Sequence, residues 1–436
     1  MEFHVKKKAY FGGRCGTIRF SNWEKREINT PACMLYMRGG AAPHLTNEII
    51  NDLFHNDFIG VHITLPTMFQ YPGPEVLKSF QEGIAKFLAL QKQYFVYLSV
   101  QDPAQEIKHT YNEEKNISVW NSGGRRKIDI EEYLQILQSF KPDLAQCLCD
   151  TVPSNQTNKR NMKSVDRTLK FLDAMQDCMK NNDILKNIEI LGSIEGGDSK
   201  TERSRSCGET SKRLVSGYVV EGINPADTPH WDALLKDVTE LLEKNKPRFL
   251  HGPLSLGKVG IIKNHVYLGI DCYQQIIKCF NLLEDVFTAF ESGIDVFDSS
   301  YPYLVSQRGC SLNYQNERKR CKPESNHIVQ TKSEPVTLNK KALQDSLNDN
   351  INFYELNIAN KRYKEDFSPL VVSCPCYSCS NHSRAYIYHL LETKEMLAQV
   401  LLMIHNLHQY FSFFKNLRVA VCTDTYEIFK QDMLKS

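Results

Sequence analysis

The chain has 436 residues, of which 42% are hydrophobic and 24% are charged, and its formal net charge is +2. This composition is too apolar for a disordered protein and too nearly neutral for a generally polycationic nucleic-acid binder, although a summed charge hides local basic surfaces. No apolar run reaches the length of a membrane-spanning helix, and none follows Lys6-Lys7-Lys8, so we expect neither a transmembrane segment nor a signal peptide. The 14 cysteines are therefore expected in a reducing compartment, where clustered cysteines bind metal more often than they form disulfides.

Eight apolar, β-branched runs of strand length recur in the first two thirds of the chain. Most of them lack strict alternation, as is typical of strands that are covered on both faces. They are residues 32–37, 59–65, 94–100, 144–149, 188–194, 217–223, 248–252 and 294–299. Helical patterns lie between them, including residues 45–53, 165–179, 231–242 and 276–290. This alternation predicts an α/β fold, and the eight units favour a closed (β/α)8 TIM barrel over an open doubly wound sheet.

The segments that flank this predicted barrel, residues 32–309, differ from it in composition. Residues 1–31 carry Gly12-Gly13 and alternating apolar residues, which predicts an N-terminal cap with a hairpin on the barrel floor. Residues 310–352 are polar and include Arg318-Lys319-Arg320, so they are interpreted as a flexible polar insertion. Order is expected to resume near Phe353, and residues 353–436 then form a C-terminal helical subdomain with the closing helices.

Three thiols within six residues, Cys374, Cys376 and Cys379, form the strongest local signal. They can converge on one tetrahedral ion, and zinc takes sulfur and nitrogen ligands in such sites. The candidates for a fourth ligand are His382, His389, His405 and His408. A site closed by four protein ligands has no position for water and is structural rather than catalytic. The alternative interpretation is three unrelated cysteines.

Geometry limits the choice of the histidine. One unbroken helix from Ser383 to His405 would place that histidine about 33 Å from the start of the helix, and hence far from the three thiols, at a rise of 1.5 Å per residue. We therefore expect a break near Glu392, with Thr393 capping a second helix of similar length that starts at Lys394 and returns the chain to the thiols. The apolar stripe of that second helix is expected to pack on the barrel, and any surplus of it could form a subunit interface.

Carboxylates follow several of the predicted strands. Asp150, Glu195, Glu221 and Asp298 lie at strand ends, and His251 ends the seventh run. In a (β/α)8 barrel such ends meet at one mouth, where paired carboxylates suit general acid–base work or nucleophilic attack on a sugar anomeric carbon. Asp298 has the best position for a nucleophile. The alternative is that these residues cap the helices that follow.

At this point the chain resembles the tRNA-guanine transglycosylase family along most of its length. The matching motifs are Thr30-Pro31-Ala32-Cys33-Met34, Gly192-Ser193-Ile194-Glu195-Gly196-Gly197, Lys246-Pro247-Arg248-Phe249-Leu250-His251-Gly252, Gly293-Ile294-Asp295-Val296-Phe297-Asp298, Tyr363 to Leu370, the three cysteines, Ser383-Arg384-Ala385-Tyr386 and His405-Asn406-Leu407. Members of this family exchange an encoded guanine in tRNA for a modified base. The resemblance implies a (β/α)8 TIM barrel with an inserted zinc-binding subdomain that helps to form dimers. It also implies one structural Zn²⁺ per subunit, held by Cys374, Cys376, Cys379 and His405.

The sequence departs from the family's catalytic pattern in its pocket. The family's D-S-G-G-F, which supplies the general acid–base aspartate, is replaced by Ser99-Val100-Gln101-Asp102-Pro103. The guanine-reading F-D-E-C becomes Leu148-Cys149-Asp150-Thr151, and the glutamine of G-I-V-Q-G-G becomes Glu195, which cannot donate a hydrogen bond when ionised. Asp298 is retained, but the threonine and arginine that follow it in the family are not. Asp150, Glu195 and Glu221 are therefore interpreted as remnants of a substrate pocket, and Asp298 as a vestigial nucleophile.

This pattern is similar to the non-catalytic accessory subunits of the family's eukaryotic members. It implies a heterodimer in which a catalytic queuine tRNA-ribosyltransferase subunit inserts queuine at the wobble guanine of tRNAs with GUN anticodons. This chain would support tRNA binding and assembly, and could form a homodimer in isolation. The resemblance also implies a cytoplasmic protein, with peripheral association at the mitochondrial outer membrane.

Two other hypotheses remain. One is a self-sufficient tRNA-guanine transglycosylase with Asp298 as nucleophile and Asp150 or Asp102 as its partner. The other is a barrel hydrolase or lyase that acts on a free small molecule through an acidic mouth.

Overall fold

The computed structural model describes residues 1–20, 27–54, 57–69, 72–105, 112–121, 123–223, 225, 228, 230–252, 260–261, 275–276, 282–314 and 354–434. Eight parallel strands close into a barrel in which each hydrogen-bonds to two neighbours, in the order β10-β11-β12-β15-β4-β5-β6-β9. The strands are β4 (Ala32–Met37), β5 (Ile59–Thr64), β6 (Tyr94–Ser99), β9 (Leu144–Gln146), β10 (Glu189–Ile194), β11 (Gly217–Val220), β12 (Arg248–Leu250) and β15 (Val296–Asp298). The predicted (β/α)8 TIM barrel is therefore confirmed, and each predicted run contains one of its strands. Strands β4, β5 and β6 are buried at every position, which is why apolar and polar residues do not alternate along them.

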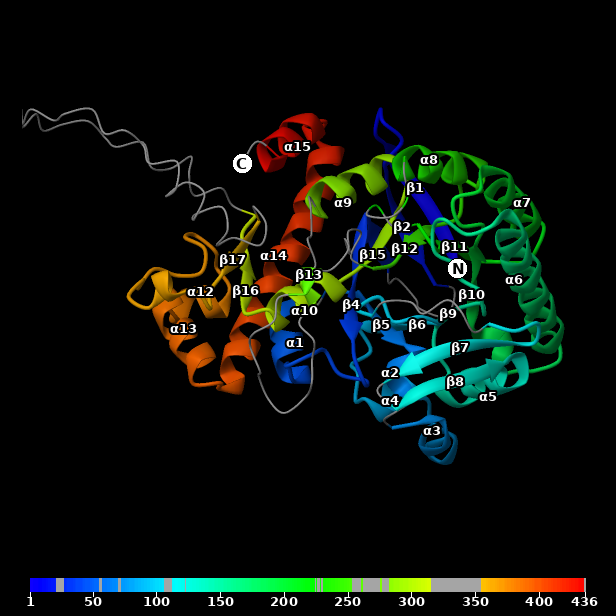
Figure 1. Cartoon of the computed structure of the whole chain (residues 1–436), viewed down its shortest axis with the longest axis horizontal. Coiled ribbons are helices and arrows are strands. Elements are labelled where there is room, and N and C mark those ends of the chain that lie inside the picture. Colours follow the sequence, from blue (N-terminus) through cyan, green and yellow to red (C-terminus); the bar gives the residue numbers. More distant parts are fainter. Residues whose placement is uncertain are drawn as a thin grey trace, which may run out of the picture.

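Helices surround the barrel and connect its strands (Figure 1). They are α1 (Asn47–Phe54), α2 (Leu65–Met68), α3 (Pro74–Phe80), α4 (Ile84–Phe87), α5 (Ile130–Phe140), α6 (Asn158–Met179), the 3-10 turn η1 (Leu185–Asn187), α7 (Lys200–Ser211), α8 (Trp231–Leu241), α9 (Leu282–Glu291) and α10 (Ser300–Gln307). The prediction of a helix from Ile276 was wrong at its start. Ile276 belongs to β14 (Gln275–Ile276), which pairs antiparallel with β13 (Gly260–Ile261), and α9 begins only at Leu282.

The N-terminal residues form a three-stranded antiparallel sheet rather than a single hairpin. Its strands are β1 (Glu2–Lys8), β2 (Arg14–Arg19) and β3 (Glu27–Thr30), in that order. Phe3, Ile18 and Ile28 pack with residues that open the barrel strands, such as Ala32 and Val296, so the sheet covers the floor of the barrel. A buried ion pair fixes it there, because the Arg14 guanidinium donates to the fully buried Asp295 carboxylate just before β15.

Two further antiparallel pairs of strands lie outside the barrel sheet. Strands β7 (Asn116–Asn121) and β8 (Gly124–Asp129) form one antiparallel pair, and β16 (Cys310–Leu312) and β17 (Glu355–Asn357) form the other. The first residues of the range interpreted as a flexible polar insertion are therefore ordered and buried in β16. The rest of that range from residue 315, including Arg318-Lys319-Arg320, lies outside the described residues.

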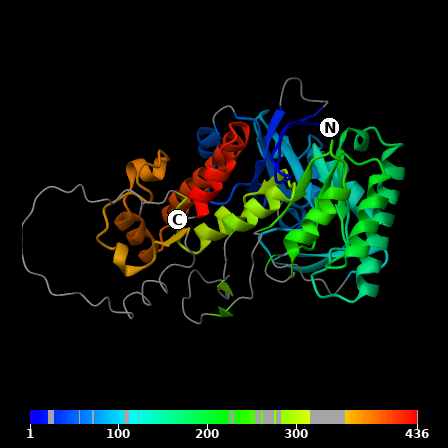
Figure 2. The same ribbon diagram turned by 90° about the horizontal axis from the view of Figure 1, so that it is seen from above.

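The C-terminal region consists of the 3-10 turn η3 (Lys361–Tyr363) and the helices α12 (Tyr377–Asn381), α13 (Arg384–Glu392), α14 (Met396–Cys422) and α15 (Tyr426–Leu434). The 27-residue α14 runs between the barrel and the pair α12 and α13, which lie at the far end of the molecule from α6 and α7 in both views (Figures 1 and 2). The expected break after Glu392 is present. Its details were wrong, because Thr393 ends α13, Glu395 caps α14, and α14 is much longer than the nine-residue α13.

Within the described part of the chain, no helix combines the length and the apolar character that crossing a membrane requires.

Candidate functional site

The predicted mouth residues all lie where the barrel strands end. Asp298 closes β15, while Asp150, Glu195 and Glu221 follow β9, β10 and β11. All four side chains are buried, with at most 6% of Glu221 exposed. The topology therefore gathers these carboxylates at the end of the barrel where enzymes of this fold carry their chemistry. Their hydrogen-bond partners show how much of each carboxylate is available.

Both oxygens of the Asp298 carboxylate are held by backbone amides. The Gly252 amide donates to Oδ2 at 2.6 Å, and the Ser300 amide donates to Oδ1 at 2.7 Å. Charge-assisted bonds of this length hold the carboxylate in one orientation. Each oxygen accepts one of them and keeps a second acceptor position, so the two amides orient the carboxylate and leave it chemically available.

Asp150 is not open to the mouth. The guanidinium of Arg160 grips its carboxylate with two bonds of 2.6 and 2.8 Å, and Arg167 adds a third of 2.9 Å. The Asn112 amide donates a fourth bond at 2.7 Å. Both arginines come from α6, so this cluster fastens that helix to the end of β9. The partners that determine this role lie 10 and 17 residues further along the chain, where the sequence motif gave no sign of them.

Glu195 differs from the other carboxylates because it favours its neutral form. Only the Thr151 hydroxyl donates to it, at 3.0 Å to Oε1, and its buried Oε2 has no partner in the described part of the chain. Burial, followed by the Glu221 charge, raises the pKa of Glu195 to about 8, although the buried Arg203 opposes this. A protonated carboxyl can donate a hydrogen bond, so the expected loss of a donor, which applies to the ionised form, does not apply while Glu195 keeps its proton.

Glu221 is tied to the interior of the barrel. Its Oε1 accepts a 2.7 Å hydrogen bond from Gln146, whose own Oε1 accepts from the Val100 amide at 3.0 Å. The His251 Nδ1 lies 3.7 Å from the same carboxylate. Gln146 is fully buried in the strand β9 and has no counterpart among the residues predicted from sequence. The only feature of the sequence that could have indicated the role of Gln146 was its inward-facing position in a short strand.

Aromatic side chains fill the space below these carboxylates. The His62 ring centre lies 4.8 Å from that of His251 and 5.0 Å from that of Tyr97. Burial lowers the pKa of His62, and His251 lowers it further. His62 Nδ1, the Tyr97 hydroxyl and His251 Nε2 are buried atoms for which the structure describes no hydrogen-bond partner. These rings form part of the packed interior of the barrel, beneath the mouth.

Asp102, which follows β6, is also buried, and one of its two oxygens is paired, while Oδ2 has no hydrogen-bond partner in the described part of the chain. The Tyr36 hydroxyl donates to its Oδ1 at 2.8 Å, and the Ala104 amide donates to the same oxygen at 3.0 Å. Burial raises the pKa of Asp102, while the bond from Tyr36 opposes that shift. The nearby Asp298 charge raises it further, which places two carboxylates close together in this mouth.

The C-terminal cysteines and one histidine form the second cluster. The ligand atoms of Cys374, Cys376, Cys379 and His405 all lie within 4.8 Å of one another. His405 Nδ1 is 3.8, 3.4 and 3.2 Å from the three sulfur atoms in that order. Three of the residues are buried and Cys379 is half-buried. Because α13 ends at Glu392, the chain turns back and α14 brings His405 to the thiols.

Local structure orients each member of this cluster. The Cys376 sulfur caps α12 by accepting from the Cys379 amide, and Ser378 fastens that helix to α14 through the Leu401 carbonyl at 2.7 Å. His405 Nε2 lies 2.8 Å from the Leu312 carbonyl, which directs a hydrogen to that nitrogen and leaves Nδ1 as the ligand. Gln409 donates to the Cys374 sulfur at 3.3 Å.

This donor set fits a tetrahedral zinc ion. Bond lengths of about 2.3 Å to sulfur and 2.0 to 2.1 Å to nitrogen require sulfur–nitrogen distances of roughly 3.6 Å, and the distances given above surround that value. The cluster can therefore hold a metal ion, and its four ligands leave no position for a reacting water.

Comparison with known proteins shows the family to which the chain belongs. A family model described as queuine tRNA-ribosyltransferase matches residues 10–281 and 279–436. A protein of Xenopus tropicalis named queuine tRNA-ribosyltransferase accessory subunit 2 is 34% identical over 432 residues, covering 97% of this chain and 96% of its own. Proteins of the same name from Homo sapiens and Trichoplax adhaerens are 34% and 33% identical, over 96% and 97% of this chain and 95% and 96% of their own.

Proposed function

Because the chain belongs to the queuine tRNA-ribosyltransferase family, we propose that it is the non-catalytic accessory subunit of a heterodimeric enzyme. In this role it supports tRNA binding and assembly, while a catalytic partner exchanges the wobble guanine for queuine in tRNAs with GUN anticodons. The relatives that cover nearly its whole length carry the name of an accessory subunit.

One observation carries the proposal: the mouth keeps Asp298 and Asp150, but both are engaged by groups of the chain itself. Asp298 is held by two backbone amides, and Asp150 by two arginines of α6. Rings of His62, Tyr97 and His251 fill the space beneath. Groups of a catalytic unit lose most of their effect when one of them is missing, so this mouth is expected to support little exchange on its own.

We further propose that Cys374, Cys376, Cys379 and His405 hold one structural Zn²⁺. The ion ties the loop of the cysteines to α14 and thereby keeps α12 and α13 in place. The C-terminal region also carries large apolar side chains that are exposed: Phe367 is 80% exposed, Met396 82% and Tyr377 59%. Exposed apolar surface is typical of protein–protein contacts, which supports a subunit interface in this region.

The catalytic partner and tRNA are the proposed binding partners, and a homodimer is the proposed state of the isolated chain. The proposal places the protein in the cytoplasm, with peripheral association at the mitochondrial outer membrane as the family resemblance implies. The self-sufficient enzyme stays the alternative, and no observation favours it over the accessory role.

Incorporation of labelled queuine into substrate tRNA tests the proposal. The purified chain is assayed alone and mixed with a catalytic family member, and the Asp298→Asn variant is assayed in the same two ways. We expect activity only in the mixture, unchanged by the substitution, because Asp298 supplies no nucleophile. Activity of the chain alone that disappears in Asp298→Asn would establish the self-sufficient enzyme instead.

A further inference from the structure

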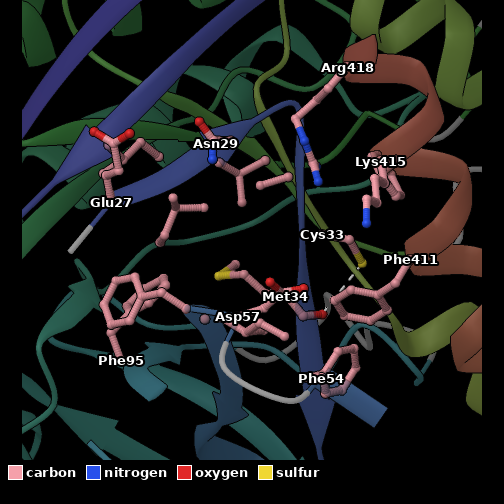
Figure 3. Close-up of a pocket in the computed structure, with 18 of the residues that line it drawn as sticks. Glu27, Asn29, Cys33, Met34, Phe54, Asp57, Phe95, Phe411, Lys415 and Arg418 are labelled. Carbon is pink, nitrogen blue, oxygen red and sulfur yellow. Dashed lines mark hydrogen bonds between the residues drawn. The ribbon is translucent and has the colours of Figure 1, made fainter. Parts of the chain in front are cut away.

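A cavity of about 660 Å³ lies at the floor of the barrel, at the opposite end from the carboxylate mouth. Its walls include Ala32, Ile59 and Val296, each the first residue of its strand. The cap sheet closes one side through Ile18 and Glu27–Asn29, and the second half of α14 closes another (Figure 3). The mouth and its residues play no part in this cavity.

Most of its wall is aromatic and apolar. Phe95 and Phe20 pack with ring centres 4.8 Å apart on one side, and Phe54 and Phe411 pack at 4.6 Å on another, with Met34 between them in Figure 3. A volume between about 300 and 1,000 Å³ and a largely hydrophobic lining are typical of sites for small organic molecules. The floor cavity has both properties.

Two cations from one helix stand over this apolar wall. Lys415 and Arg418 of α14 both extend their nitrogen atoms toward the cavity in Figure 3. Arg418 donates to the Pro31 carbonyl at 2.8 Å, and the structure describes no ion pair for either cation. Burial lowers the pKa of Arg418, so its charge stands in a poorly solvated position. Arg418 is half-buried and its described hydrogen-bond partner is a neutral carbonyl, so its charge remains available to attract an anion.

The remaining charges leave room for that anion. Asp57 also lines the cavity, next to Met34 in Figure 3, and its charge raises the pKa of Arg418, but no ion pair joins it to either cation in the described part of the chain. Glu27, on the cap side, is already engaged by Arg19 at 2.9 Å and by Lys6 at 3.4 Å. His408 also lines the cavity from α14, and burial lowers its pKa, so it adds no charge near neutral pH.

We propose that the floor cavity binds a small amphipathic organic anion. Its carboxylate or phosphate lies at Lys415 and Arg418, and its apolar body lies against Phe95, Met34 and Phe54. The site is separate from the exchange reaction, because the layer of Tyr97 and Phe249, with ring centres 5.6 Å apart, stands between it and the mouth. Occupation would connect β4 of the barrel to α14, the helix that also carries His405.

Decanoate is the probe, and isothermal titration calorimetry of the full chain is the measurement. We expect saturable binding at one site, weaker binding of the uncharged 1-decanol, and a loss of affinity of about tenfold in Lys415→Gln, since hydrogen bonds to charged groups have this magnitude. Lys415 is exposed, so this variant is expected to fold. The matched control is Lys364→Gln, an exposed lysine far from the cavity, which leaves the affinity unchanged.

A second variant probes the apolar body independently. Ser412→Phe introduces a ring from a half-buried position on the cavity wall without changing any charge, and it should weaken both decanoate and 1-decanol. Equal decanoate affinity in wild type, Lys415→Gln and Ser412→Phe would overturn the proposal. So would the lack of saturable binding to the wild-type chain at millimolar decanoate.

Discussion

The metal cluster and the barrel mouth are both buried groups of side chains that can bind ligands, but they are organised in opposite ways. In the metal cluster, the four ligand atoms face one another, and their other hydrogen bonds run outward to Leu312 and Gln409. In the mouth, Asp150 and Asp298 already accept hydrogen bonds from other parts of the chain. Buried ligand groups that converge on one common point form a site, whereas carboxylates that already accept hydrogen bonds from neighbouring elements maintain the fold.

The largest effect is expected from breaking the metal cluster. In Cys376→Ser, the ion loses a thiolate that also caps α12, so the loop, α12 and α14 lose their common anchor. We expect zinc content to fall below one per chain, and unfolding free energy to drop by more than about 4 kcal/mol. Elemental analysis and urea unfolding measure the two quantities. Cys178→Ser, at an exposed free cysteine, is the control and should change neither. A stable Cys376→Ser protein with a full complement of zinc would refute the ligand assignment.

A smaller but clear loss of unfolding free energy is expected in Asp150→Asn, because the substitution leaves Arg160 and Arg167 facing a neutral amide. Removing one partner of a buried ion pair costs about 3 to 5 kcal/mol, and the partial exposure of the two arginines reduces this to roughly 2 to 3 kcal/mol. Glu114→Gln is the matched control, because Glu114 pairs with the same Arg167 at the surface and should contribute less than about 1 kcal/mol. Equal urea midpoints for the two variants would show that Asp150 is no anchor of α6.

The same residue explains what the sequence could and could not reveal. Strands such as β4 were predictable because a buried strand carries its own signal in consecutive apolar residues. The placement of Asp150 at a strand end was predictable for the same reason. Its function was not, because Arg160 and Arg167 reach it only once α6 packs against β9, and nothing in the local sequence encodes that contact. Gln146, His62 and Tyr97 escaped prediction because an inward side chain of a strand resembles any other core position.

More of the metal cluster could be predicted from the sequence, but not all of it. The cysteines stand close together in the chain, so their convergence needed no tertiary contact. The choice of His405 depended on the break before α14, where Lys394 adopts a positive φ of 60° and Glu395 caps the helix. Thr393 has a side chain suited to capping and was preferred on propensity, but its hydroxyl bonds backward to the His389 carbonyl at 2.9 Å.

An intermediate effect, which depends on pH, is expected from Glu195. Its folded pKa of about 8 exceeds the ordinary value of 4.5, so the folded chain holds a proton that the unfolded chain releases. The contribution of Glu195 to the free energy of unfolding is therefore fully present below about pH 4.5. It is lost as the pH rises toward 8, by roughly 1 kcal/mol per pH unit. Glu195→Gln removes that loss. In urea unfolding at pH 5.5 and 7.5, the free energy of unfolding of the variant relative to that of the wild type should be higher at pH 7.5 than at pH 5.5. Parallel curves would mean that Glu195 is ionised in the folded chain and that the mouth is better solvated than its burial indicates.

The smallest effect is expected one layer outside the metal cluster, at Gln409. Its amide donates to the Cys374 sulfur at 3.3 Å, so Gln409→Leu leaves all four ligands in place and removes only one outer hydrogen bond. Outer partners of this kind typically contribute tenfold or more to metal affinity, and we expect a loss of about tenfold with less than about 1 kcal/mol of unfolding free energy. Competition with a chelator measures the affinity. Asn416→Leu, exposed on the same helix, is the control. If Gln409→Leu competes like the wild type, the outward hydrogen bonds do not tune the ion, and the contrast with the mouth then rests on the four converging ligands alone.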